Sequence, residues 1–405
     1  MIKKNILFRN NIQKKYLNEY LKKEFTKKLQ NVFKEVNYKI NNTETTYNIL
    51  SSNFKFNFKN KDLQKFRSFK KIAIIGMGGS ILGSEAIYEF LKKKIKKKIY
   101  FFNDLDPKKI LNFKKENNLN KTLFLIISKS GATVETLANF FSLNILKNKN
   151  KNIILISEKN DSLLCTVSKK FKLFYIEHKK NISGRFSVLS EAGIVPAYLM
   201  GVNTSRLRSN IQKFLKNRGK LFLKESSIKL ASLLKSKKIN NLIFLNYSPE
   251  LEKFLFWCQQ LIAESLGKKG KGFLPMISNV PKDHHSLLQL YLDGPKDKIF
   301  HIFSLEENFK EKLEIKKVNK KNNFLHKKTL NEVKTAQKDA LIKAFKRNKI
   351  PFREFKIKAI NEEVLGELFS YFILETILIS KLIGVNPFDQ PAVEQVKIYT
   401  KKLLS

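Results

Sequence analysis

The chain has 405 residues, a formal net charge of +44, 42% hydrophobic residues and two cysteines. This length exceeds what one hydrophobic core usually serves, so we expect two domains, and the apolar content excludes a disordered chain. Cys165 and Cys258 lie far apart in the sequence and offer neither a disulfide framework nor metal-ligand spacing, which favours a reducing cytoplasm.

The positive charge comes mainly from lysine, because arginine accounts for only eight of the 79 basic residues. Specific contacts to phosphates and bases usually rely on arginine, so we expect no specific nucleic-acid partner. The positive field would instead steer anionic substrates towards the protein. The most apolar stretch, 365–385, carries Glu367, Glu375 and Lys381. It therefore predicts a buried helix rather than a membrane span.

Residues 1–65 are polar and rich in Lys and Asn, and we interpret them as a helical leader that packs on the first domain. From Lys71 onward, strands and helices are expected to alternate, which predicts a parallel sheet covered on both faces. The expected strands are 71–75, 98–102, 122–127, 152–156 and 172–176, and the expected helices are 81–94, 106–116, 134–148 and 161–170. We assign this block, 66–205, to a first domain.

A second alternating block follows in residues 206–384. Its expected strands are 241–246, 299–304 and 353–357, and its expected helices are 250–266, 329–347 and 361–383. Gly384 and Pro387 end the long helix, and a last helix closes the segment 385–405. The predicted fold is therefore α/β, with two doubly wound parallel-sheet domains and a ligand at the carboxyl ends of the strands.

Two loops in the first domain have the composition of anion-binding loops. Gly76–Ser80 and Ser128–Thr133 each follow a buried apolar run and precede a helix. Such loops direct backbone N–H groups and hydroxyls at one spot, which most often holds a phosphate. The three hydroxyls of the second loop exceed the single one that a helix cap requires. The two loops together predict one phosphorylated small molecule.

Nucleotide cofactors fit these loops less well. The dinucleotide fingerprint requires a glycine where Ile81 stands, although Asp104 after the second strand keeps a nicotinamide cofactor open. Gly267 and Lys268 lack the upstream glycine and the hydroxyl of a phosphate-binding loop for ATP.

Three further residues carry candidate chemistry. Arg185 lies in a tight turn before an apolar helix, and a buried guanidinium suits a carboxylate, a phosphate or a developing oxyanion. Glu264 ends an apolar helix, where the helix dipole disfavours the charged carboxylate, as a general base requires. His284 and His285 are adjacent without further metal ligands nearby, so acid or base use of one of them is favoured over a metal site.

Six motifs in this order resemble those of the glucose-6-phosphate isomerase family in its compact bacterial form. They are Gly76–Ser80, Ser128–Thr136, Ser183–Ser190, Glu264–Lys268, His285–Leu290 and Asp389–Lys397. The resemblance implies two sugar isomerase domains and the reversible conversion of glucose 6-phosphate to fructose 6-phosphate in glycolysis and gluconeogenesis. Ring opening and proton transfer through an enediolate would need no cofactor and no metal.

The resemblance also implies residue roles. Glu264 would move the proton between C1 and C2, and Arg185 would stabilise the enediolate. His285 and Lys397 would open the sugar ring, with His285 supplied by the partner subunit of a homodimer. Contacts to the phosphate and the rest of the substrate would come from Gly79, Ser80, Ser128, the Lys129 backbone, Ser130, Thr133, Gln260 and Gln390. Ser183 departs from the family, which usually has glycine there.

Other functions remain open from the sequence. A non-catalytic sugar-phosphate-binding regulator of the same domain type would keep the hydroxyl loops, but it would have no reason to retain Arg185, Glu264, His285 and Lys397 together. A nucleic-acid-binding protein predicts clustered arginines and interleaved aromatic residues, which the sequence lacks. A related isomerase that also accepts mannose 6-phosphate is a narrower alternative.

Overall fold

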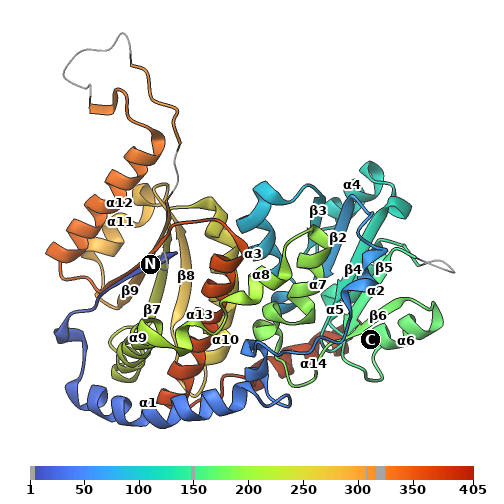
Figure 1. The fold of residues 1–405 in the computed structure, drawn as a ribbon, viewed down its shortest axis with the longest axis horizontal. Coiled ribbons are helices and arrows are strands. Elements are labelled where there is room, and N and C mark those ends of the chain that lie inside the picture. Colours follow the sequence, from blue (N-terminus) through green and yellow to red (C-terminus); the bar gives the residue numbers. More distant parts are fainter. Residues whose placement is uncertain (1–4, 147–150, 307–308, 316–323) are drawn as a thin grey trace.

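The computed structural model describes residues 5–146, 151–306, 309–315 and 324–405 and contains two five-stranded sheets (Figure 1). The first sheet is parallel throughout and has the order β3-β2-β4-β5-β6. Its strands are β2 (Lys71–Gly76), β3 (Lys98–Phe102), β4 (Thr122–Ile127), β5 (Ile153–Ser157) and β6 (Phe174–Glu177). Near-continuous Ile, Leu and Phe runs form these strands because both faces of the sheet are buried.

The second sheet has the order β1-β10-β9-β7-β8. Its strands are β1 (Ile6–Asn11), β7 (Asn241–Asn246), β8 (Leu274–Asn279), β9 (Lys298–Leu305) and β10 (Phe352–Ile357). Strands β7 to β10 are parallel, whereas β1 pairs antiparallel with β10. The two sheets share one plan, since β7 lies between β8 and β9 as β2 lies between β3 and β4. The predicted α/β fold with two parallel sheets is confirmed, except that β1 adds one antiparallel strand at the edge of the second sheet.

Helices cover both faces of each sheet. On the first sheet, α4 (Pro107–Glu116), α5 (Val134–Ser142) and α6 (Leu163–Lys170) pack on one face, and α3 (Leu82–Leu91) and α7 (Glu191–Met200) on the other. On the second sheet, α11 (His284–Asp293) and α12 (Leu330–Arg347) face away from the first sheet, and α9 (Asn217–Ser236), α10 (Glu252–Leu266) and α13 (Glu362–Ile383) face inward (Figure 1). The inner helices α3 and α10 contact each other, so one apolar core runs between the sheets.

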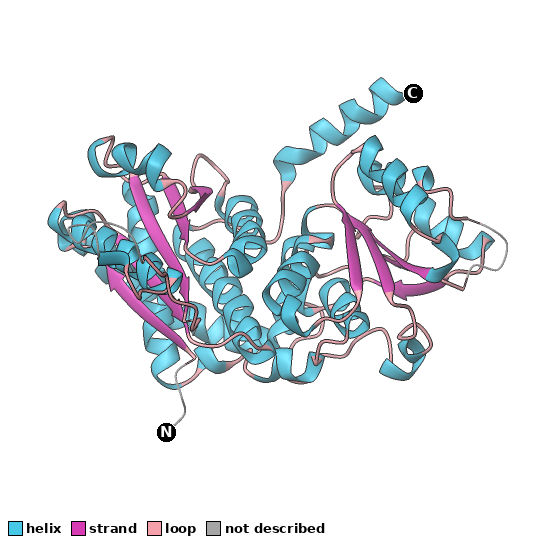
Figure 2. Ribbon diagram, turned by 90° about the horizontal axis from the view of Figure 1, so that it is seen from above, coloured by secondary structure: helices cyan, strands magenta, loops and turns pink. Residues whose placement is uncertain are grey.

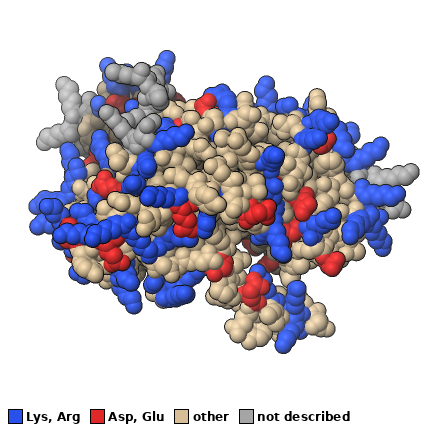
Figure 3. Space-filling view, turned by 60° about the horizontal axis from the view of Figure 1, so that its bottom comes forward, with Lys and Arg blue, Asp and Glu red and all other residues tan. Residues whose placement is uncertain are grey.

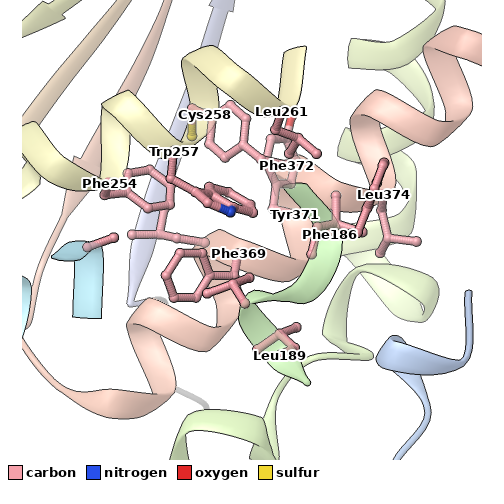
Figure 4. Packing of buried hydrophobic residues seen from close by; sticks show 14 of the residues in the cluster. Phe186, Leu189, Phe254, Trp257, Cys258, Leu261, Phe369, Tyr371, Phe372 and Leu374 are labelled. Atoms are coloured by element: carbon pink, nitrogen blue, oxygen red, sulfur yellow. The ribbon is translucent and has the colours of Figure 1, made fainter. Parts of the chain in front are cut away.

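The centre of this core is aromatic. Trp257 of α10 lies edge-on to Phe369 of α13, with ring centroids 4.8 Å apart. Phe186 and Leu189, from the turn Gly184–Leu189, are buried beside them (Figure 4). Because interiors pack densely and shift little, this cluster gives the neighbouring Arg185 and the helix that carries Glu264 a rigid base.

A buried ion pair fastens α13 to the second sheet. Arg353 of β10 donates to Glu375 of α13 at 2.9 Å, and the Tyr371 hydroxyl donates to the same carboxylate at 2.6 Å. All three side chains are almost fully buried. Removing one partner of such a pair is costly because it strands a buried charge. The network therefore holds α13 in place, and the segment that follows α13 reaches Arg185.

The leader is mainly helical, as predicted, but much of it packs on the second sheet and not on the first domain. The leader begins with β1, which joins the second sheet through pairs such as Ile6 with Ile357. The long helix α1 (Glu19–Ile40) packs on α9 and α13, and Glu35 forms an ion pair with Lys381 at 2.8 Å. The pairing partner of β1 is distant in the sequence, so local composition could not reveal it.

The last helix, α14 (Glu394–Leu404), stands away from the body of the protein (Figure 2). Only Thr400 of its residues is partly buried. The proposed domain limits 1–65, 66–205, 206–384 and 385–405 stay a prediction, since the inner core is continuous between the two sheets. Among the described helices, none is both long enough and apolar enough to cross a bilayer.

Candidate active site

The first glycine loop packs directly against the turn that carries Arg185. A Cβ atom on Gly79 would lie 2.2 Å from the backbone carbon of Gly184, closer than any real side chain could approach. Gly78 has a φ of +52°, and a Cβ there would lie 2.7 Å from the Gln260 amide nitrogen. Glycines are needed here because three segments of backbone and side chain converge without space between them.

Arg185 is buried, with 1% of its side chain exposed. Its Nε donates to Ser265 Oγ at 2.9 Å, and its Nη1 donates to Glu264 at 3.0 Å and to Gln390 at 3.1 Å. Its Nη2 donates to the backbone carbonyls of Pro387 and Asp389. Burial lowers the pKa of the Arg185 guanidinium, and the Glu264 carboxylate opposes that shift. The turn, α10 and the segment after α13 therefore meet at one cation.

The Glu264 carboxylate lies at the C-terminal end of α10 and is 32% exposed. Its Oε2 accepts from Arg185, and its Oε1 accepts from Gln260 Nε2 at 3.3 Å, one helical turn earlier. The Oε1 atom of Gln260 is buried and has no hydrogen-bond donor among the described residues. The carboxylate is thus held by a cation on one side and reached by solvent on the other, as a proton-transferring group requires.

The hydroxyls of the second loop, Ser128–Thr133, remain available to a ligand. Ser128 Oγ and Thr133 Oγ1 lie 2.9 Å apart, and Thr133 does not use its side chain to cap α5. Ser130 is exposed and accepts from the Ala132 amide at 3.3 Å. The Lys129 amine is engaged elsewhere, with the Lys180 carbonyl at 2.9 Å, so only its backbone is available to the loop.

The two loops are neighbours at the carboxyl edge of the first sheet. Gly76 at the end of β2 pairs with Ile127 at the end of β4, directly before Ser128. Adjacent strands lie about 4.8 Å apart. The glycine loop, which includes the partly buried Ser80, therefore lies between the hydroxyl loop and the Arg185–Glu264 pair.

Two predicted site residues lie apart from this centre. His285 is exposed at the start of α11, and its neighbour His284 contacts the Tyr247 hydroxyl at 3.1 Å. Lys397 lies on the exposed α14 and forms an ion pair with Glu394 at 2.7 Å. The structure of one chain thus brings together Arg185, Glu264, Gln260, Gln390, Gly79 and the two loops, but it joins neither His285 nor Lys397 to them.

Two residues contribute to the site although the sequence motifs assign them no role in it. Ser265 directly follows Glu264, and its hydroxyl oxygen accepts a hydrogen bond from Arg185 Nε. No spacing of residues in the sequence predicts this contact. Lys268 pairs with Asp389 at 2.7 Å and thereby ties the end of α10 to the segment that binds Arg185. Lys268 and Asp389 lie in two different sequence motifs, so their contact depends on the tertiary fold.

The sequence is similar to known isomerases over most of its length. The sequence profile described as phosphoglucose isomerase matches residues 27–273. A probable glucose-6-phosphate isomerase of Methanococcus maripaludis is 34% identical over 83% of this chain and 78% of its own length. The glucose-6-phosphate isomerase of Methanocaldococcus jannaschii is 32% identical over 83% of this chain and 86% of its own length.

Solved structures share the fold. A hypothetical protein of Thermus thermophilus superposes with a TM-score of 0.80 at 24% identity, covering 98% of this chain and 100% of that one. A glucose-6-phosphate isomerase from Chlamydia trachomatis gives a TM-score of 0.67 at 18% identity, covering 85% and 72%. On the match of its sequence to the profile and to these relatives, the chain belongs to the phosphoglucose isomerase family.

Proposed function

We propose that the protein catalyses the reversible conversion of glucose 6-phosphate to fructose 6-phosphate, as the names of its relatives state for them. The observation that carries the proposal is the contact between Arg185 and Glu264 beside the glycine loop. A regulator that only binds a sugar phosphate needs the hydroxyl loops but not this pair of a buried cation and a partly exposed carboxylate.

The phosphate of the substrate is held by the hydroxyl loop. Ser128, Ser130 and Thr133 supply hydroxyls, and Gly79, Ser80 and the Lys129 backbone face the same edge of the sheet. Ser128 and Thr133 bond only each other through their side chains among the described residues, so both can turn to a phosphate without breaking another contact. Binding energy from the remote phosphate positions the reacting carbons and lowers the barrier.

Glu264 moves the proton between C1 and C2. A positioned base contributes about 10²–10⁴-fold to the rate. Arg185 faces the same space, and its Nη1 shifts a hydrogen bond from Glu264 or Gln390 to the oxygen on which negative charge develops. The loss of a preorganised donor of this kind costs about 3–4 kcal/mol. Gln260 and Gln390 flank the pair and contact the sugar hydroxyls.

Ring opening is assigned to His285 and Lys397. Both are exposed in a single chain, which supports a homodimer in which His285 enters the site of the partner subunit. Lys397 reaches a site when α14 packs against protein instead of solvent. The two cysteines are free and buried, which supports a cytoplasmic protein that serves glycolysis and gluconeogenesis.

A coupled assay tests the proposal directly. Purified protein with fructose 6-phosphate and a chelator is expected to form glucose 6-phosphate, which a glucose-6-phosphate dehydrogenase reports as NADPH. A parallel assay with mannose 6-phosphate tests the narrower alternative, an isomerase that accepts this sugar phosphate as well. Binding of fructose 6-phosphate without any product would favour the non-catalytic regulator and refute the proposal.

A further inference from the structure

A polar cavity of about 370 Å³ lies in the second sheet, and none of its lining residues belongs to the candidate active site. It opens between the ends of β7 and β9, the strand β10, the edge strand β1 and the first half of α12. Ser304, Lys338, Glu354 and Lys356 line it, together with Arg9 from the leader. A cavity of this volume accommodates a small metabolite.

The cavity repeats the position of the hydroxyl loop in the other sheet. In the first sheet, Gly76 pairs with Ile127, and Ser128 comes next. In the second sheet, Asn246 pairs with Phe303, and Ser304 comes next. Because β7 and β9 correspond to β2 and β4 in strand order, Ser304 occupies the place of Ser128. The following helix has a threonine at its N-terminal cap in both cases, Thr133 for α5 and Thr329 for α12.

Two buried oxygen atoms in the cavity have no hydrogen-bond partner in the described part of the chain. Ser304 is only 7% exposed, and its Oγ has no hydrogen-bond partner among the described residues. Glu354 is 4% exposed, and its Oε2 accepts no hydrogen bond from the described part of the chain, with Arg9 Nη1 3.5 Å away. Buried polar atoms are ordinarily paired, so each of these points to a group that the protein itself does not supply.

The charges around the cavity are arranged for an anion with hydroxyl groups. Arg9, Lys334, Lys338 and Lys356 contribute four positive charges, against three carboxylates. Lys338 forms short ion pairs with Glu354 Oε1 at 3.0 Å and with Asp339 at 2.8 Å. Lys356 makes a longer ion pair, 3.7 Å from Glu306. Thr329 and Glu332 already form a capping box at the start of α12, so side chains rather than helix amides would hold the ligand.

We propose that this cavity is a second binding site, for a small phosphorylated polyol. The phosphate pairs with the basic side chains, one hydroxyl of the ligand donates to Glu354 Oε2, and another bonds with Ser304 Oγ. The proposal depends on the residues that line this cavity and stands apart from the isomerase activity proposed for the site around Arg185 and Glu264. Each chain would then have two anion sites, one beside Ser128 and one beside Ser304, at corresponding positions of the two sheets.

Isothermal titration of the full chain with sn-glycerol 3-phosphate tests this site. The wild type is expected to bind two equivalents per chain. Ser304→Ala and, separately, Lys356→Gln should each weaken one of them about tenfold or more, and both are expected to unfold within a few degrees of the wild type. Ser128→Ala with Thr133→Val should remove the other equivalent and leave the cavity site intact.

Two results would overturn the proposal. One is a single equivalent per chain that disappears in the Ser128→Ala, Thr133→Val variant. The other is a second equivalent whose affinity neither Ser304→Ala nor Lys356→Gln changes. The coupled isomerase assay on the wild type is independent of both, so a failure of the second site and a failure of the proposed activity are distinguishable.

Discussion

Arg185 connects the segments of the candidate active site. Its guanidinium donates to side chains of α10 and to the backbone after α13, while its own turn packs against the glycine loop. A planar guanidinium can serve several acceptors at fixed angles, whereas a lysine amine cannot reproduce that geometry. The identity of this residue, and not only its charge, therefore determines the shape of the site.

Replacement of Arg185 by lysine tests this dependence. We expect kcat for fructose 6-phosphate to fall about 10²–10³-fold because the oxyanion loses a preorganised donor. Arg206→Lys is the matched control, since Arg206 also donates two hydrogen bonds to a carboxylate, that of Glu363, but does so at the surface. An Arg185→Lys variant as active as the Arg206→Lys control would contradict the role of Arg185.

The paired hydroxyls of Ser128 and Thr133 make a second prediction at this scale. Their simultaneous replacement, Ser128→Ala with Thr133→Val, removes two hydrogen bonds to a charged phosphate, each worth about 1.5–3 kcal/mol. We expect KM for fructose 6-phosphate to rise at least about tenfold, as measured in steady-state assays. Thr26→Val, at an exposed position of α1, should leave KM unchanged. An unchanged KM in the double variant would place the phosphate elsewhere.

Sequence motifs predict the residues of the site better than their contacts. Arg185, Glu264 and Gln390 lie in separate motifs and meet in the fold. Ser265 escapes prediction because a serine in an apolar helix has many uses. The roles of His285 and Lys397 stay predictions because both side chains lie outside the cluster within one chain.

At the scale of elements, the sequence predicts the central strands and the long helices but not β1 and β8. β8 contains Pro275 and forms an edge of its sheet, with a burial pattern that alternates only partly. Proline is typical of such edges and weakens a strand prediction. β1 lies in a polar leader, and its partner β10 is about 350 residues away, with Ile6 paired to Ile357. Apolar runs with both faces buried, such as β4, have no such ambiguity.

The contact between the glycine loop and the Arg185 turn gives a prediction about elements. Gly79→Ala places a Cβ 2.2 Å from Gly184 backbone, so the two segments must separate. We expect the free energy of unfolding to fall by about 1–3 kcal/mol and kcat/KM to fall as well, as chemical denaturation and the coupled assay would measure.

Gly184→Ala is the control because a Cβ there meets only the Gly79 Cα atom, at 3.9 Å. At a compatible backbone conformation this substitution leaves stability unchanged or raises it by about 0.4–1 kcal/mol. Equal effects of the two substitutions would show that the close approach of the segments is not required.

At the scale of the whole molecule, the positive charge on the face seen in Figure 3 is spread and not gathered. Lysines and arginines are distributed over the face seen in Figure 3, with acidic residues among them. On this face the distribution agrees with a general attraction for anionic substrates and not with a nucleic-acid groove. Such steering weakens as salt screens it.

The proposed exchange of His285 between subunits predicts complementation. Co-expression of Glu264→Gln and His285→Gln chains should yield hybrid dimers in which one site combines the intact Glu264 of one chain with the intact His285 of the other. Random pairing predicts recovery of about a quarter of the wild-type activity, because half of the dimers are hybrid and each has one complete site. No recovery above the separate variants would place both residues of a site in one chain.

The central claim is that the Glu264 carboxylate carries the proton between C1 and C2. Its most direct test is the rate of glucose 6-phosphate formation by Glu264→Gln, with Glu225→Gln on the surface of α9 as the control. We expect the Glu264→Gln variant to bind fructose 6-phosphate normally and to lose about 10²–10⁴-fold in kcat, while the control retains full activity. A Glu264→Gln protein that converts fructose 6-phosphate at nearly the wild-type rate would contradict the account.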